Sequence, residues 1–105
     1  CICPGLKMSI EALTQRTSKL PRIELAFPQN IVGKSTVSGM QSGALYGHVG
    51  QVDYLLEGIK QEMGEAFVVA TGGMSALITE KSKQIDKADA LLTLEGLRIL
   101  YEWNI

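Results

Sequence analysis

The stretch Ala66–Ile78, which reads AFVVATGGMSALI, has the residue types best suited to ligand binding in this chain. Its apolar residues predict a short strand that ends at Thr71-Gly72-Gly73, and a helical pattern follows. Glycine permits positive φ and close approach of a ligand to the backbone, and N–H groups at a helix start suit polar or anionic groups. Two interpretations stay open: a nucleoside- or phosphate-binding turn, or an ordinary strand-to-helix corner.

A second candidate is Gly33–Thr36, which reads GKST and resembles the end of a phosphate-binding P-loop. The first glycine of G-x-x-x-x-G-K-[ST] belongs five residues before Gly33, where this chain has Pro28. We therefore reject a P-loop. Lys34 and Thr36 could still hold a carboxylate or hydroxyl ligand at a helix start. The simpler interpretation is helix capping by Ser35 or Thr36.

The remaining reactive side chains do not form a catalytic set. His48 has no second ligand or base nearby in the sequence, so we interpret it as structural. Cys1 and Cys3 have neither the spacing of a redox pair nor that of a metal knuckle. The aspartates are Asp53, Asp86 and Asp89. None of them has an evident partner for acid–base chemistry. We predict no catalytic residue and no metal ligand in this chain.

Composition indicates one soluble globular domain. The chain has 105 residues, of which 46% are hydrophobic and 20% charged, with a formal net charge of −1. Charges are scattered, so we expect no nucleic-acid partner. No apolar stretch approaches the roughly 18 residues that span a bilayer, so we expect no membrane association and a cytoplasmic location. The first residues, CICPG, read as a strand already under way without an initiator Met, and we expect a fragment.

Alternating helical and strand patterns predict the α/β fold class, with a mixed sheet. The long helix is expected to carry Gly39, Gly43 and Gly47 on one face, because these residues are four apart. That face would suit tight packing against the sheet or another helix, contact with a second subunit, or room for a ligand. The predicted elements are a strand end at Cys1–Cys3, a helix from Lys7 to about Lys19 stopped by Leu20-Pro21, an extended segment at Arg22–Phe27, a long helix from about Thr36 to Met63, a strand at Phe67–Ala70 buried on both faces, a short helix at Met74–Ile78, a strand at Ile85-Asp86, and an amphipathic helix at Leu91–Trp103 capped by Thr93.

Taken together, four segments of the chain resemble the C-terminal part of type III pantothenate kinase. They cover nearly the whole chain and follow the family's order, so the set is specific although no single motif decides it. The segments are PGLKMSIEALTQRTSKLP, IVGKSTVSGMQSGALYGHVGQVD, VVATGGMSALI and LLTLEGLRILYEWN.

The resemblance implies a fold and an activity. The family belongs to the acetate and sugar kinase, Hsp70 and actin superfamily, whose members have two RNase H-like α/β domains around a nucleotide cleft. Residues 1–105 are then expected to form the C-terminal part of the second domain. The family transfers the γ-phosphoryl group of ATP to pantothenate, the first step of coenzyme A biosynthesis. It uses Mg²⁺ and a monovalent cation (K⁺ or NH₄⁺) and works as a homodimer.

The resemblance also implies site residues. Thr71, Gly72 and Gly73 match the superfamily's adenosine motif. Thr36 matches the threonine of the family's Gly-Lys-Asn-Thr segment, which is expected to reach the pantothenate site of its own or the partner subunit. Ser35 replaces the usual Asn, which leaves any role of a side-chain amide unfilled.

Several family motifs have no counterpart in this chain: the phosphate-binding Asp-x-Gly-Asn-Thr, the Gly-x-Asp-Arg that brings a catalytic aspartate base, and the Asp-x-Gly-Thr that opens the second domain. Phosphoryl transfer depends on positioning and charge stabilisation around the phosphates, so we expect the isolated chain to be inactive. Two alternatives remain open. One is a non-catalytic regulatory or interaction module of the same fold, and the other is a stand-alone α/β binding domain that oligomerises through its glycine face.

Overall fold

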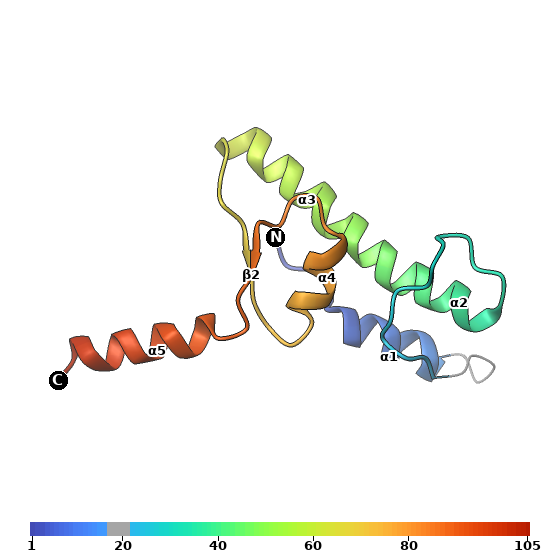
Figure 1. Ribbon diagram of the computed structural model, residues 1–105, viewed down its shortest axis with the longest axis horizontal. Helices are drawn as coiled ribbons and strands as arrows, with labels where there is room; N and C mark the ends of the chain where they lie inside the picture. The colour runs from blue at the N-terminus through green and yellow to red at the C-terminus, as the bar shows by residue number, and fades with distance from the viewer. Residues whose placement is uncertain (17–21) are drawn as a thin grey trace. The chain divides into compact units, whose positions relative to one another are not determined.

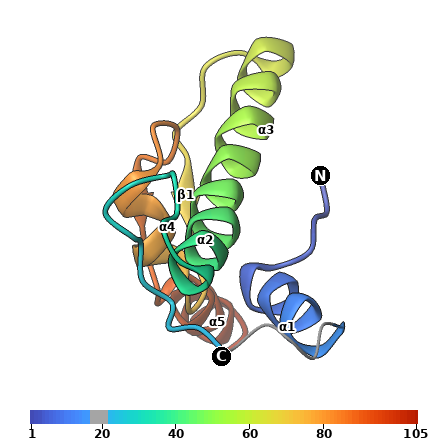
Figure 2. The same ribbon diagram turned by 90° about the vertical axis from the view of Figure 1, so that its right-hand side faces the viewer.

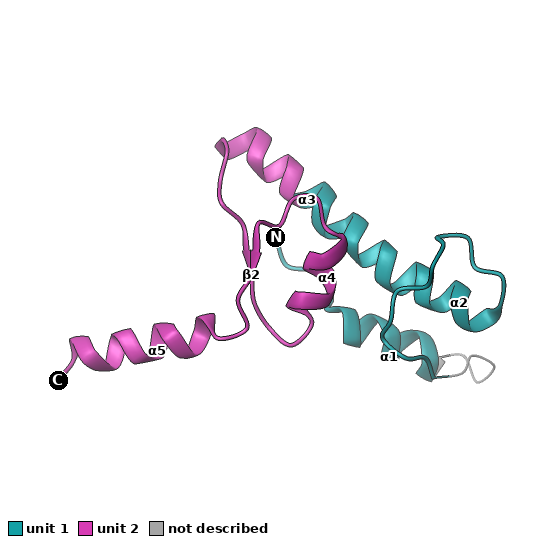
Figure 3. Ribbon diagram, in the orientation of Figure 1, with its two compact units in different colours: residues 1–55 teal, residues 56–105 magenta. Residues whose placement is uncertain are grey.

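The computed structural model describes residues 1–16 and 22–105, which form two compact units (Figure 3). Cys1–Leu55 make up unit 1 and Leu56–Ile105 unit 2. The predicted helix end near Lys19 and the stop at Leu20-Pro21 lie outside the described residues.

Unit 1 begins with helix α1, Leu6–Arg16 (Figure 1), and α1 packs against the π-helix η1, Ser42–Tyr46. Leu6 and Ile10 lie four residues apart on one face of α1 and are both buried. The predicted helix is therefore confirmed as far as Arg16. The expected strand end at residues 1–3 and the extended segment at residues 22–27 form no strand in the described chain.

The long helix predicted from Thr36 to Met63 is present, but it is not α-helical throughout. It consists of α2 (Thr36–Gln41), η1 (Ser42–Tyr46) and α3 (Gly47–Met63) in direct succession. Ser35 caps its start, because the Ser35 hydroxyl accepts a hydrogen bond from the Ser38 backbone N–H. The helix ends at Gly64, whose φ of 93° is the left-handed conformation that favours glycine.

The Cβ positions of the three glycines on this helix point into space that no described residue fills. A Cβ added at Gly39, Gly43 or Gly47 would meet nothing within 4 Å, so among the described residues these three positions do not form the tight packing surface that was one of the expected interpretations. The close approach occurs elsewhere. A Cβ at Gly33 would lie 2.4 Å from the Cα of Gly39, so the backbone of residue 33 needs glycine to lie against α2.

Unit 2 contains a strand–helix–strand arrangement. Strands β1 (Val69–Ala70) and β2 (Lys87–Ala88) pair in parallel, with Val69 opposite Lys87. Helix α4 (Ser75–Lys81) connects them and packs against both strands, and Figure 2 shows it beside β1. A helical crossover is the usual way to join two parallel strands. The described chain is therefore an α/β structure, rich in helix and with a small parallel sheet.

Both strands differ from their predicted positions. The first is shorter than the predicted Phe67–Ala70, and the second follows Ile85-Asp86 instead of including it. Phe67 is 71% exposed, so the prediction of a strand buried on both faces is wrong. The reason is that burial of both faces needs a sheet with covering layers on each side, and only two strands pair in the described residues.

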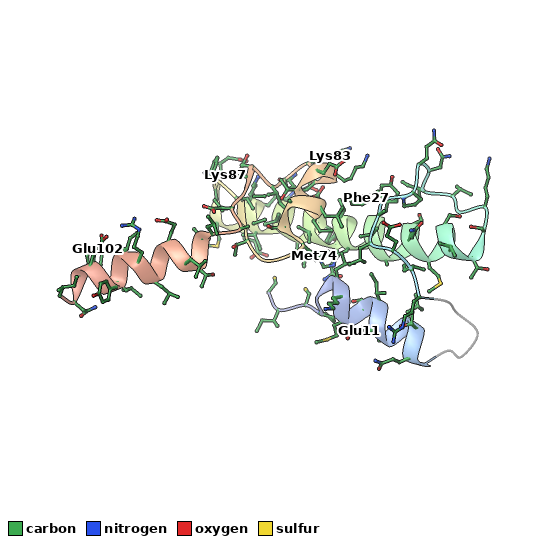
Figure 4. The ribbon with its side chains drawn as sticks, turned by 60° about the horizontal axis from the view of Figure 1, so that its bottom comes forward. Glu11, Phe27, Met74, Lys83, Lys87 and Glu102 are labelled. Carbon is green, nitrogen blue, oxygen red and sulfur yellow. The ribbon has the colours of Figure 1, made fainter. Side chains whose placement is uncertain are left out.

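The last helix, α5, spans Leu92–Trp103, and all of its residues are exposed. Thr93 lies inside its first turn, so the predicted cap at Thr93 is wrong; instead, the Asp89 carboxylate accepts a hydrogen bond from the Leu91 N–H at 3.0 Å. Side chains stand out from α5 in Figure 4, where Glu102 is labelled. Within residues 1–16 and 22–105, no helix combines the length and apolar character needed to cross a bilayer.

Candidate functional site

The turn Thr71–Gly73 connects the carboxyl end of β1 to the start of α4. Gly72 has a φ of 105°, which L side chains rarely adopt, so the backbone at this residue favours glycine. The Gly72 carbonyl accepts hydrogen bonds from the Ser75 hydroxyl at 2.8 Å and from the Ser75 N–H at 3.2 Å. All three turn residues are exposed. The turn is thus a fixed corner whose backbone remains accessible, at the strand end where α/β proteins bind ligands.

Alanine substitutions separate the conformational role of Gly72 from that of its neighbour. We expect Gly72→Ala to lower the free energy of unfolding by about 1–2 kcal/mol, because alanine is strained at positive φ. Gly73→Ala is the matched control, since Gly73 lacks a positive φ and its Cβ position is open. We expect its effect to be near zero, or stabilising by up to about 1 kcal/mol. Urea unfolding of the two variants measures both effects, and equal losses of stability would contradict this account.

Two backbone N–H groups of the Gly33–Thr36 segment are already hydrogen-bonded to a nearby side chain. The Ser38 hydroxyl accepts from the backbone N–H groups of Lys34 and Ser35, each at 3.0 Å. These are donors that a phosphate loop would offer to its ligand, so the geometry agrees with rejection of a P-loop. Ser35 provides the cap, and Thr36 is the exposed first residue of α2. The Thr36 side chain is therefore accessible to a ligand.

The aspartates near β1 and β2 have structural partners. The Asp86 carboxylate accepts a hydrogen bond from the Val68 N–H at 2.7 Å, and the Asp89 carboxylate holds the Leu91 N–H before α5. In unit 1, partial burial lowers the pKa of His48, which favours its neutral form. Among the described residues, no three His, Cys, Asp or Glu side chains gather where they could hold a metal ion.

Three side chains that the sequence analysis missed bind the segment before the GKST stretch to the long helix. The Tyr46 hydroxyl donates to the Pro28 carbonyl at 2.7 Å, and the Ser42 hydroxyl donates to the Ile31 carbonyl. The third bond runs from Gln41 Nε2 to the Glu24 carbonyl, at 3.0 Å. A local sequence pattern could not have identified these residues, because each partner lies 11 to 18 residues away.

Thr36 lies in unit 1 and the Thr71–Gly73 turn in unit 2. Together, the described elements define an α/β protein that carries an accessible glycine turn at the end of a parallel strand.

Comparison with known proteins then gives the family. The profile described as "Type III pantothenate kinase" matches residues 1–58, which is more than half of the chain, and the chain belongs to this family. The curated protein "Type III pantothenate kinase" of an Exiguobacterium strain is 55% identical over 103 residues. That match includes 98% of this chain but only 41% of the relative, so the chain spans about two-fifths of the relative's length.

Proposed function

We propose that this chain is part of an enzyme that phosphorylates pantothenate to 4'-phosphopantothenate with ATP, in the first step of coenzyme A biosynthesis. The observation that carries the proposal is the 55% identity to the Exiguobacterium type III pantothenate kinase over 103 residues. Phosphoryl transfer is catalysed mainly by positioning and electrostatic stabilisation. The proposed contribution of this chain is to hold the two substrates, and none of its residues is assigned as the catalytic aspartate.

The adenosine of ATP is proposed to lie against Thr71, Gly72 and Gly73. Two observations support this position: the turn is exposed, and a Cβ at Gly72 or Gly73 would meet no atom within 4 Å. A flat nucleoside can therefore approach the backbone closely. The two hydrogen bonds from Ser75 to the Gly72 carbonyl restrain the turn, which limits the entropy lost on binding.

Pantothenate is proposed to contact Thr36. The hydroxyl of Thr36 can donate to or accept from a polar group of the substrate, and capping of α2 does not need it, because Ser35 provides the cap. Mg²⁺ and K⁺ or NH₄⁺ follow from the family resemblance. The described residues contain no cluster of metal ligands, so we assign none of them to a cation.

The family resemblance further suggests a cytoplasmic homodimer with RNase H-like domains of the actin-like ATPase type. The parallel β1–α4–β2 arrangement is compatible with part of such a domain. The open glycine face of Gly39, Gly43 and Gly47 supports a close contact with a second subunit, since another backbone could approach it.

A reciprocal pair of variants tests the two binding roles. The protein is a chimera in which this chain replaces the matching residues of the Exiguobacterium relative. We expect Gly73→Leu to raise KM for ATP by about tenfold, because the leucine would cover the proposed adenosine surface. Thr36→Val should raise KM for pantothenate by about two- to tenfold, as expected for loss of one neutral hydrogen bond. Each variant controls for the other, since its second KM should not change. Initial rates at varied concentrations of each substrate measure both constants, and an unchanged KM for the assigned substrate would contradict that assignment.

A further inference from the structure

Residues Pro28–Ile31 are hydrogen-bonded to the π-helix η1 at two places. Ser42 and Tyr46 are the first and last residues of η1, and their hydroxyls donate to the carbonyls of Ile31 and Pro28. Ser42 is 5% exposed, and its hydrogen bond to the Ile31 carbonyl is partly buried. Short π-helical turns occur frequently at functional sites. Here the turn presents two hydroxyl donors to one loop.

Ring packing supports the same attachment. Phe27, labelled in Figure 4, has its ring centroid 5.0 Å from that of Tyr46, with the planes tilted by 49°. Aromatic pairs in this range add roughly 0.5–1.5 kcal/mol beyond their buried area. Tyr46 therefore holds the loop with both its ring and its hydroxyl, and the two contributions can be separated by Tyr46→Phe.

The fastened loop leads directly into the segment that carries Thr36. Only Val32 separates Ile31 from Gly33, whose backbone lies against Gly39 of α2. A loop that is held at both Ile31 and Gly33 has little conformational freedom. The contacts of these two residues therefore fix the position at which the chain enters α2. Without them, the loop could sample other conformations, and only a fraction would present Thr36 as in this structure. A smaller competent fraction weakens apparent affinity in proportion.

We propose that Ser42 and Tyr46 are positioning residues for pantothenate binding. They touch no substrate; they hold Pro28–Ile31 on η1 and so fix the Gly33–Thr36 segment. The inference rests on the proposed contact between Thr36 and pantothenate, and it adds the residues that keep this contact in place. The ATP side is assigned to the Thr71–Gly73 turn, so the anchors should affect the binding of one substrate and not the other.

Tyr46→Phe is the direct test, because it removes the hydroxyl and keeps the ring. In this chain, we expect faster hydrogen exchange of the backbone N–H groups from Gln29 to Ser35. In the chimera, we expect KM for pantothenate to rise about two- to tenfold, with kcat and KM for ATP unchanged. Tyr54→Phe is the matched control, since Tyr54 lies on α3 and is 77% exposed. Ser42→Ala is the second variant and should change the same quantities in the same direction.

The possible outcomes separate this inference from the proposed function. Unchanged exchange at residues 29–35 in both anchor variants overturns the inference, whatever the kinetics show. Faster exchange with an unchanged KM for pantothenate also overturns it. If Thr36→Val raises that KM in the same experiment, the proposed role of Thr36 stands and only the anchoring is wrong. If Thr36→Val has no effect either, the proposed pantothenate contact fails and the inference fails with it. An equal rise in both KM values indicates general destabilisation and contradicts a positioning role.

Discussion

Replacing Leu45 by alanine is expected to lower the free energy of unfolding by about 2–5 kcal/mol, the range for large-to-small changes in a packed core. Leu45 is the one fully buried large side chain among the described residues, with 0% exposure. It lies in η1, the element against which α1 packs. The substitution leaves a cavity next to the long helix, which carries Thr36, Ser42 and Tyr46. The loss of stability should appear as a lower midpoint of urea unfolding.

Leu97→Ala is the matched control for this prediction. Leu97 lies on α5 and is 57% exposed, so its truncation should change stability by no more than about 0.5 kcal/mol. If the two variants unfold at the same urea concentration, Leu45 does not contribute to a packed core in solution. That result would contradict the arrangement of unit 1.

The second large effect is expected for Gly33→Ala, at about 1–3 kcal/mol of lost stability. The new Cβ would lie 2.4 Å from the Cα and 2.5 Å from the N of Gly39, a distance that requires a backbone shift. Because no flexible side chain can move aside, the loop before α2 must lift from the helix. The same substitution should therefore raise KM for pantothenate in the chimera.

Gly39→Ala is the informative partner of Gly33→Ala, because the two residues meet at this contact but only one lacks space. A Cβ at Gly39 would meet nothing within 4 Å, and alanine favours a helix over glycine by roughly 0.5–1 kcal/mol. We expect Gly39→Ala to be stabilising in thermal unfolding of this chain. Destabilisation of similar size in both variants would show that the contact is arranged differently.

Local sequence patterns predicted the helices better than the strands, for physical reasons. Helical spacing is local, and the long helix was predicted within its observed bounds of Thr36 and Met63. The π-helix η1 within this long helix was not predicted, because apolar spacing does not reveal a change from i→i−4 to i→i−5 hydrogen bonding. The strands depend on partners distant in sequence, and both were misplaced: β1 is shorter and β2 lies two residues later than expected.

The candidate site divides in the same way. A strand followed by Thr71-Gly72-Gly73 is a local signal, and the positive φ of Gly72 agrees with it. Ser35 was among the two residues predicted as a cap of α2, and it is the cap. The contacts of Ser42 and Tyr46 with Ile31 and Pro28 carry no local signal, since they depend on how the loop folds back onto the helix. Neither residue was predicted to have a role.

The central claim is the proposal that this chain holds ATP and pantothenate in a pantothenate kinase and does not carry out the phosphoryl transfer by itself. Pantothenate-dependent formation of ADP, measured in parallel for the isolated chain and for the chimera with the Exiguobacterium relative, tests this claim most directly. We predict no measurable turnover by the isolated chain and turnover by the chimera that requires both ATP and pantothenate. ADP formation by the isolated chain would contradict the claim. A chimera that unfolds as cooperatively as the relative itself but shows no pantothenate-dependent ADP formation would contradict it as well.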